Sequence, residues 1–411
     1  MLPEFLLFTF LGSFAGIILG LIPGMHINNI LPFILMLSFI TPSSLAVFVA
    51  SLSISQIFVG YISSVFLGAP NEDTSLSVLP GHKLLLEGRG YEAIKLVVFG
   101  GICSVLLSLA IIAIVAKYFV YLYEISRPYI QYPILLVIIF MILSEKSLKK
   151  ILLATLIVLS SGFLGLVVLN SSLVSQQNCM FPLLSGFFGL STLVISIREK
   201  SRIPKQQEDD KINLSALNFL KSTLLGSLAG IVVGFLPAIG VSQAATIAQY
   251  LGGMGDPRNF LVTLSSINTA NEVFSLSSLY LVGNPRSGSS VAISRILPNL
   301  ELEEVLMLVG SICIASSIAS LATLYLGKRI PRILVKVNYT YLSLVVIAYM
   351  TLAIFAFTGI YGLLIAFTSA SIGILCANFG VRRSNCMGCL LIPSLLFFSG
   401  LSPLVLSTLK L

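Results

Sequence analysis

Two apolar segments, one in each half of the chain, follow the same pattern and are interrupted at the same place. The first reads GSFAGIILGLIPG over residues 12–24, and the second reads GSLAGIVVGFLPA over residues 226–238. Proline breaks a helix because it lacks a backbone N–H and its ring collides with the preceding turn. Apolar helices interrupted at corresponding positions of two halves are typical of secondary transporters, in which the break lies at the binding site. We therefore expect two repeats, each with one broken helix.

The composition excludes a water-soluble domain. Hydrophobic residues make up 56% of the 411 residues, charged residues make up 10%, and the mean hydropathy is +1.02. Ordinary globular chains carry roughly 25% charged residues. Apolar runs long enough to cross a bilayer recur along the chain, and the basic residues lie in short loops between them, where they set orientation rather than bind nucleic acid. We expect an all-α, multi-pass protein of the plasma membrane, surrounded by the lipid bilayer.

Each half divides into one bent pair of apolar segments and five further spans. The expected segments are 4–41 (bent at Pro23-Gly24), 44–68, 91–116, 129–144, 151–169 and 180–197, then 216–251 (bent at Pro237), 261–283, 305–326, 339–357, 360–377 and 388–408. If each bent pair is a re-entrant hairpin, each half crosses the membrane five times, and this odd number inserts the halves in opposite orientations. This predicts about ten transmembrane helices, two re-entrant hairpins, and three parts: a first repeat (1–197), a charged linker (198–212) and an inverted second repeat (213–411).

The distribution of charge agrees with inverted repeats. Cytoplasmic loops of membrane proteins carry an excess of Lys and Arg. Placing the linker in the cytoplasm leaves few of the 24 basic residues outside, namely Lys117, Arg127, Arg286, Arg295 and Lys410. Two full crossings in place of each hairpin would give the same distribution. The charge therefore supports the inversion, whereas the hairpins rest on the Pro/Gly breaks.

Polar residues follow both helix breaks and form the first set of candidate substrate ligands. This set is Gly24, His26, Asn28, Asn29, Ser242 and Gln243. Asn28 or Asn29, and Ser242, are suitable N-caps for a helix that restarts after the break. A restarting helix presents unpaired N–H groups and the positive end of its dipole, which favour an anion. Two such ends predict one central anion site; the alternative is a lipid-facing kink.

A second pair of Gly/Pro breaks supplies further candidates. Residues 68–75 read GAPNEDTS and residues 283–290 read GNPRSGSS, so each break is followed by residues that cap helices. The candidate ligands here are Asn71, Thr74, Asn284, Arg286, Ser287 and Ser289. The Arg286 guanidinium suits a carboxylate or a phosphate. The alternative for Arg286 is a surface loop.

Glu272 lies within an expected span and is the candidate for energy coupling. Carboxylates inside membrane spans are costly and are functional candidates by default. With Asn268, Thr269 and Asn271 it could bind a proton or Na⁺, and no other cofactor is expected. The alternative is a helix-end carboxylate in headgroup water. We expect no enzyme, because the sequence has no H-E-x-x-H motif, no paired Asp-rich motifs and only two histidines.

These motifs resemble the large membrane subunit of tripartite tricarboxylate transporters, the TctA family. The resemblance rests on the glycines and proline of residues 16–24, on the later breaks, and on a block over residues 80–93. In that block the matching residues are Gly81, Gly88, Arg89, Glu92 and Ala93, while Pro80 stands where the family favours Asp.

The resemblance implies gradient-driven uptake of carboxylates, normally with a small membrane subunit and an extracytoplasmic binding protein. The short chain and its His-x-Asn-Asn tip are more similar to archaeal members that act alone. Polyprenyl-phosphate translocases also resemble this arrangement of inverted repeats with Pro-Gly tips. We therefore expect a secondary-active transporter of a di- or tricarboxylate-like anion, driven by Na⁺ or H⁺, with a lipid-phosphate translocase as the alternative.

Overall fold

The chain is helical throughout the part that the structure describes. The computed structural model describes residues 2–409 except 24, 26, 28–33, 35–39, 70–73, 116, 117, 119, 120, 122–124, 126, 146, 177, 199–203, 208–210, 236–239, 252–254, 284 and 335–338. The first half contains α1 (Leu2–Leu21), α3 (Pro42–Leu67), η1 (Ser75–Ser77), α4 (Val78–Leu86), α5 (Gly90–Val115), η3 (Arg127–Tyr129), α7 (Gln131–Leu143), α8 (Leu148–Asn170), α9 (Met180–Leu184), the π-helical η4 (Ser185–Leu190) and α10 (Ser191–Arg198). The second half contains α11 (Ala216–Phe235), α12 (Val241–Leu251), α13 (Pro257–Val282), α14 (Gly288–Ile296), α15 (Leu302–Leu334), α16 (Tyr339–Asn378), η5 (Arg383–Met387), α17 (Gly388–Phe398) and α18 (Ser402–Leu409).

Eight helices among the described residues are long and apolar enough to cross a membrane. This confirms the all-α, multi-pass prediction. The structure differs from the expected spans in two places. Helix α7 has only 13 residues, and α17 and α18 are bent by 118° where one continuous span was expected. The re-entrant hairpins and the opposite orientation of the halves stay predictions.

Helix α16 covers both of the expected spans 339–357 and 360–377. Gly359 has φ 65° and ψ −160°, which interrupts the helical backbone. A Cβ added at Gly362 would lie 3.5 Å from the Ile354 side chain. Eight residues of straight helix would separate these positions by about 12 Å. The chain therefore turns back at Gly359, as the expected spans 339–357 and 360–377 require.

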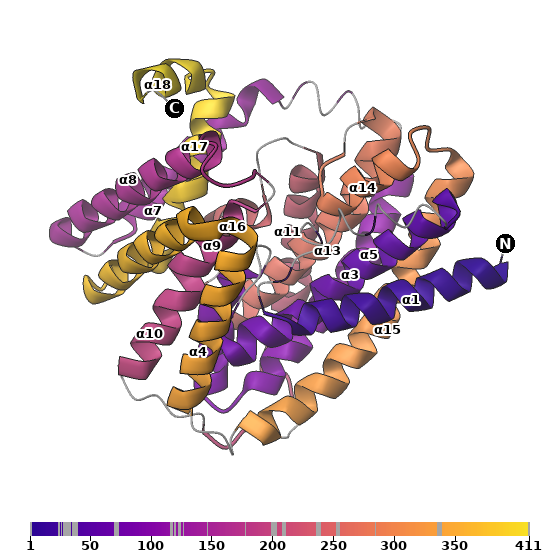
Figure 1. Cartoon of the computed structure of the whole chain (residues 1–411), viewed down its shortest axis with the longest axis horizontal. Coiled ribbons are helices and arrows are strands. Elements are labelled where there is room, and N and C mark those ends of the chain that lie inside the picture. The colour runs from indigo at the N-terminus through magenta and orange to yellow at the C-terminus, as the bar shows by residue number, and fades with distance from the viewer. Residues whose placement is uncertain are drawn as a thin grey trace.

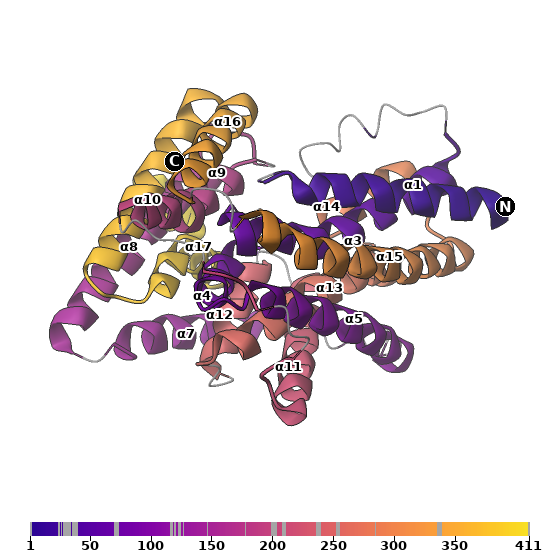
Figure 2. The same cartoon turned by 90° about the horizontal axis from the view of Figure 1, so that it is seen from below.

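The helices form two bundles, and each bundle takes helices from both halves of the chain (Figure 1). The α3–α13 bundle consists of α1, α3, α5, α11, α13 and α15, and the α8–α16 bundle consists of α7, α8, α9, α10, α16 and α17. Figure 2 shows the bundles side by side, with α4 and α12 between them. Helix α3 of the first half packs against α15 of the second half, and α13 of the second half packs against α5 of the first half. Each contact therefore has a counterpart. This exchange of partners supports two related repeats.

Basic residues from the loops expected in the cytoplasm meet in space. The Nζ atoms of Lys95 and Lys328 lie over the ring of Tyr91, 5.1 and 5.8 Å from its centroid. Lys95 also donates to the backbone oxygen of Lys211 in the linker. These residues come from both halves and from the linker, so the contacts agree with the charge distribution.

The repeated glycines mark the closest helix contacts in the α3–α13 bundle. Glycines 12, 16 and 20 of α1 face α3, and glycines 226, 230 and 234 of α11 face α13. A Cβ at Gly16 would lie 2.8 Å from the Ser55 Cβ and closer still to the Leu52 backbone oxygen. Small residues at four-residue spacing allow two membrane helices to approach this closely. The sequence pattern thus encodes a packing surface as well as a helix break.

We expect the Gly16→Ala variant to unfold at a lower temperature than the wild type in detergent. The added methyl group meets backbone atoms that cannot move aside, and overpacking of this kind costs about 1–3 kcal/mol. Gly310→Ala is the matched control, because a Cβ there meets only the Phe5 ring, at 3.6 Å. Equal melting temperatures for the two variants would contradict the close contact between α1 and α3.

Candidate functional site

The end of α1 is held by two polar side chains of α3. Gln56 accepts a hydrogen bond from the Ile27 N–H (3.1 Å) and donates one to the Met25 carbonyl (2.9 Å). Ser63 donates to the last carbonyls of α1, those of Gly20 and Leu21. Gln56 is only 2% exposed. A backbone broken inside a membrane protein must find such partners, because no water is available in the hydrocarbon region.

Four of the predicted ligands at this first break are Gly24, His26, Asn28 and Asn29, and all four lie outside the described residues. The role of this tip in binding therefore stays a prediction.

The second break restarts as α12, and its first turn is capped by Gln243. The Gln243 Oε1 accepts a hydrogen bond from the Gly240 N–H. This is one half of a capping box, in which the third helical residue reaches back to the N-cap. Ser242 was expected to be the cap, but it is the second residue of α12. The cap is supplied by Gln243 because its longer side chain can reach back over the first turn.

The start of α12 contacts the second break of the first repeat. The Ser242 and Ser75 hydroxyls share a hydrogen bond of 3.1 Å, and Gln243 Nε2 donates to the Ser394 hydroxyl at 3.1 Å. All four side chains are at least 95% buried. Ser75 opens η1, while Ser394 belongs to α17 of the α8–α16 bundle. The Ser242–Ser75 cluster, defined by these four residues, therefore joins η1 and α12 to α17 of the α8–α16 bundle.

The second pair of Gly/Pro breaks forms as expected. Gly68 ends α3 and Gly283 ends α13, and both adopt left-handed backbone conformations, with φ of 65° and 70°. A residue with φ in this range ends many helices, and glycine adopts it without strain. Thr74 precedes η1 but makes no side-chain cap, and its carbonyl accepts from Ser64 and Ser77. Asn71 and Asn284 lie outside the described residues.

The break after α13 brings Glu272 to the start of α14. Ser287 caps α14 in a capping box with Ser290, and Ser290 Oγ also accepts from the Arg286 N–H. Ser289 donates to Glu272 Oε1 at 2.6 Å. Glu272 is 2% exposed, so the alternative of a headgroup-exposed carboxylate does not fit its burial. The structure therefore places Ser289 against the coupling candidate, with the Ser287 hydroxyl 2.7 Å from that of Ser289 and Arg286 directly before them in the chain.

The polar residues that precede Glu272 lie on α13, a helix most of whose residues are buried. Asn268 donates to the Tyr61 hydroxyl at 2.7 Å, and Thr269 donates to the Gly101 carbonyl. Asn271 accepts from Ser275 on its own helix. Within the described residues no group of three His, Cys, Asp or Glu side chains could hold a metal ion. The oxygen atoms available on α13 are those of Asn, Thr, Ser and one carboxylate, a set that suits a proton or Na⁺ better than a transition metal.

Sequence reasoning missed several residues of these clusters. Ser75 and Ser394 complete the Ser242–Ser75 cluster, while Gln56 and Tyr61 satisfy polar groups near the breaks. One signal was present for Gln56, because it is an amide within a long apolar span. Ser394 had no such signal, because serines are frequent in this chain and its partner is 151 residues away.

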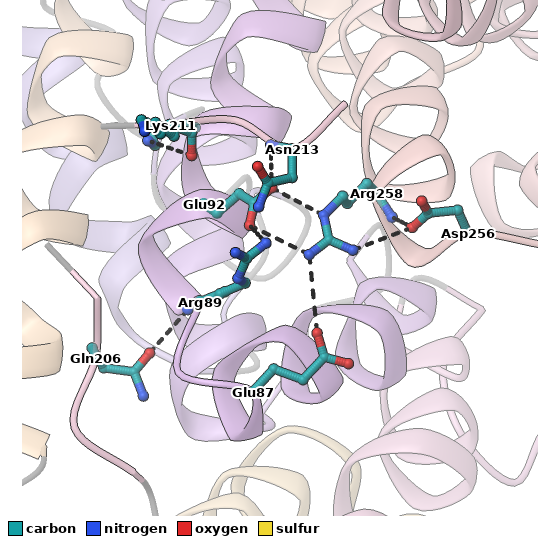
Figure 3. A network of polar contacts seen from close by, with 10 residues as sticks. Glu87, Arg89, Glu92, Gln206, Lys211, Asn213, Asp256 and Arg258 are labelled. Atoms are coloured by element: carbon teal, nitrogen blue, oxygen red, sulfur yellow. Dashed lines mark hydrogen bonds and ion pairs between the residues drawn. The ribbon is translucent and has the colours of Figure 1, made fainter. Parts of the chain in front are cut away.

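The block that carries the family resemblance forms a polar network at the entrance of α5 (Figure 3). Glu92 Oε1 accepts from Arg258 Nε at 2.9 Å and from the Asn213 N–H at 2.7 Å. Arg89 lies 3.3 Å from the other Glu92 oxygen. The network ties α5, the start of α13 and the end of the linker together, so the block holds both halves of the chain in one bundle.

The Arg258 guanidinium in this network is surrounded by carboxylates. Glu92, Asp256 and Glu87 lie 2.9, 3.6 and 4.0 Å from its nitrogens. Burial acts to lower the pKa of Arg258, but the hydrogen bond that Arg258 donates to Glu92 and the nearby negative charges outweigh it, so the pKa is raised. Arg258 therefore stays charged at every physiological pH.

Gln56→Leu should lower the melting temperature and increase hydrogen exchange at the Ile27 amide. The substitution leaves a buried N–H and a buried C=O without their partner, at about 1–3 kcal/mol for each group. Gln176→Leu is the matched control, because Gln176 is exposed. If both variants melt alike, Gln56 does not hold the broken end of α1.

Comparisons with known proteins identify the family of the chain. The chain is 32% identical over 405 residues to the uncharacterised protein MJ1079 of Methanocaldococcus jannaschii, a match that covers 96% of this chain and 98% of that protein. No solved structure matches the chain significantly. The profile of the tripartite tricarboxylate transporter TctA family matches residues 6–388. The chain therefore belongs to the TctA family of membrane permeases.

Proposed function

We propose that this chain is a secondary-active permease for a di- or tricarboxylate anion, which binds where the two bundles meet. The family implies a component of a tricarboxylate transporter. The observation that carries the proposal is the Ser242–Ser75 cluster, because it brings helix starts from the two repeats together between the bundles. Secondary transporters bind substrates at such broken helices and move one bundle against the other.

The chemistry of the cluster supports an anion. The first turn of α12 has backbone N–H groups and the positive end of a helix dipole, both of which favour negative charge. Ser75, Ser242 and Ser394 add hydroxyl groups that can donate to a carboxylate. Arg286 would supply a guanidinium to a second carboxylate of the substrate.

Glu272 is our candidate for coupling transport to an ion gradient. Its carboxylate is buried next to Ser289, and the oxygens of Asn268 and Thr269 lie on the preceding turn of α13. A buried carboxylate that binds H⁺ becomes neutral, and one that binds Na⁺ has its charge balanced, and either change lowers the cost of moving it through a membrane. We propose that ion binding at Glu272 stabilises the state that binds the anion.

Family members work in tripartite systems, and we propose a small membrane subunit and an extracytoplasmic binding protein as candidate partners. Transport by the purified chain alone, reconstituted in liposomes, would show that these partners are not required. Transport that appears only after the partners are added would show that they are.

Replacing Arg286 by Ala should weaken anion binding. In the wild type, citrate at about 100 times its Kd should stabilise the purified protein by about 2.7 kcal/mol. The variant should need roughly tenfold more citrate for the same rise in melting temperature, since a hydrogen bond to a charged group contributes about 1.5–3 kcal/mol. The control is Arg295→Gln, which removes an exposed arginine from the end of the neighbouring helix. A response only to a short-chain polyprenyl phosphate would replace the carboxylate proposal with a lipid-carrier translocase.

Glu272→Gln should impair gradient-driven uptake more than binding. The amide keeps the size of the carboxylate but does not titrate and carries no charge, so accumulation against a gradient should fall while citrate still stabilises the protein. Uptake of labelled citrate into proteoliposomes, with Na⁺ and H⁺ gradients imposed separately, identifies the ion. Glu303→Gln serves as the control because Glu303 is exposed. Undiminished accumulation by Glu272→Gln would remove Glu272 from the coupling mechanism.

A further inference from the structure

A cavity of about 620 Å³ lies beside the Ser242–Ser75 cluster, between the two bundles. Its walls come from α4, α7, η4, α12, the start of α13 and η5. The polar residues that line it include Lys83, Gln249, Tyr250, Arg382, Arg383 and Ser384. This volume is within the range of small-molecule sites, about 300–1,000 Å³.

The cavity is strongly basic. Lys83, Arg382 and Arg383 line it, and Asp256 is the acidic residue among the lining residues that the structure describes. The Asp256 carboxylate accepts from the Arg258 N–H and lies 3.6 Å from the Arg258 guanidinium, so it already has a cationic neighbour, and the three basic lining residues outnumber it. Next to Lys83, burial and then the charge of Arg383 lower the pKa of His82 to about 4, so that imidazole is neutral near pH 7. The walls therefore favour an anion.

The basic groups are held in place by several elements. Arg383 donates to the Ser191 and Thr192 hydroxyls, at the end of the π-helical segment. Arg382 donates its backbone N–H to Glu145 and its guanidinium N–H to the Ser144 hydroxyl. π-helical turns occur frequently at functional sites. The cavity thus combines hydrogen-bonded guanidinium groups with the exposed charge of Lys83.

Two short helices lead from the cluster to the cavity. Helix α12 carries Gln243 at the cluster and Tyr250 at the cavity, where the Tyr250 hydroxyl bonds Ser384 at 2.7 Å. Seven residues of helix span about 10 Å. In the first half, the chain runs from Ser75 at the cluster through η1 and α4 to Lys83 at the cavity. Both helices belong to the segments that follow the breaks of the repeats.

The geometry points to a second carboxylate site in this cavity, a vestibule through which the anion passes on the side of the cytoplasmic loops. Lys83, Arg382 and Arg383 would hold the carboxylates of a di- or tricarboxylate, with Ser384 and Tyr250 as further hydrogen-bond donors. The assignment to a carboxylate rests on the proposed function. The vestibule would raise the local concentration of the anion next to the central site, since a cleft lined by one sign of charge attracts the opposite ion.

Citrate binding to the full-length protein in detergent tests the vestibule by isothermal titration at low ionic strength. We expect Kd to rise about tenfold in Lys83→Gln and in Arg383→Gln, because each loses one charged contact. Lys149→Gln is the matched control, since Lys149 is exposed at the start of α8, which is expected on the same side, but does not line the cavity. Lys83→Gln should leave the fold intact, because that side chain is exposed.

The possible outcomes distinguish a failure of the vestibule from a failure of the proposed function. A rise in Kd for Lys83→Gln and Arg383→Gln, with Lys149→Gln unchanged, supports the vestibule. An unchanged Kd in both cavity variants, alongside weaker binding in Arg286→Ala, overturns the vestibule and leaves the central site standing. If citrate does not bind the wild type but a short-chain polyprenyl phosphate does, both the carboxylate function and the vestibule are overturned.

Discussion

The structure depends on hydrogen bonds to the backbone groups that are left without helical partners where a helix breaks inside a membrane protein. A helix that ends in the hydrocarbon region leaves carbonyl and N–H groups that water cannot reach, and each costs several kcal/mol unless protein groups replace the water. Here Gln56 and Ser63 hold the end of α1, and Gln243 caps the start of α12. Because these contacts come from within the protein, both breaks can persist without water. The candidate binding site exists because they persist.

Each of the two bundles forms from helices of both halves of the chain. The glycine surfaces of α1 and α11 bring these helices close to α3 and α13, and the exchange of α5 and α15 joins the two halves into one bundle. Helix α13 can then carry Asn268, Thr269 and Glu272, since nearly all of its residues are shielded from lipid. The Glu92–Arg258 contact joins α5 to the start of α13, and Glu92 also accepts from the N–H of Asn213, directly after the linker.

The sequence predicted the helical membrane fold, and α1 and α11 end within two residues of the predicted breaks at Pro23 and Pro237. It did not predict which side chains would meet. Ser242 looked like a cap, because small hydroxyl residues after a break favour that position, yet Gln243 is the cap and Ser242 instead bonds Ser75. Lys83, Arg382 and Arg383 were expected only as loop charges, and their convergence on one cavity depends on the packing of η5 beside α4 and α12.

By itself, the sequence determined that the chain is a multi-pass helical membrane protein of the TctA type with two related halves. Hydropathy, charge and Pro/Gly breaks are local properties, so they can be detected without knowledge of distant contacts. Only the tertiary structure decided that Glu272 is buried beside Ser289, that Ser75 meets Ser242, and that three basic residues share a cavity. These contacts join residues far apart in the chain or on separate elements, and their formation depends on how whole helices pack.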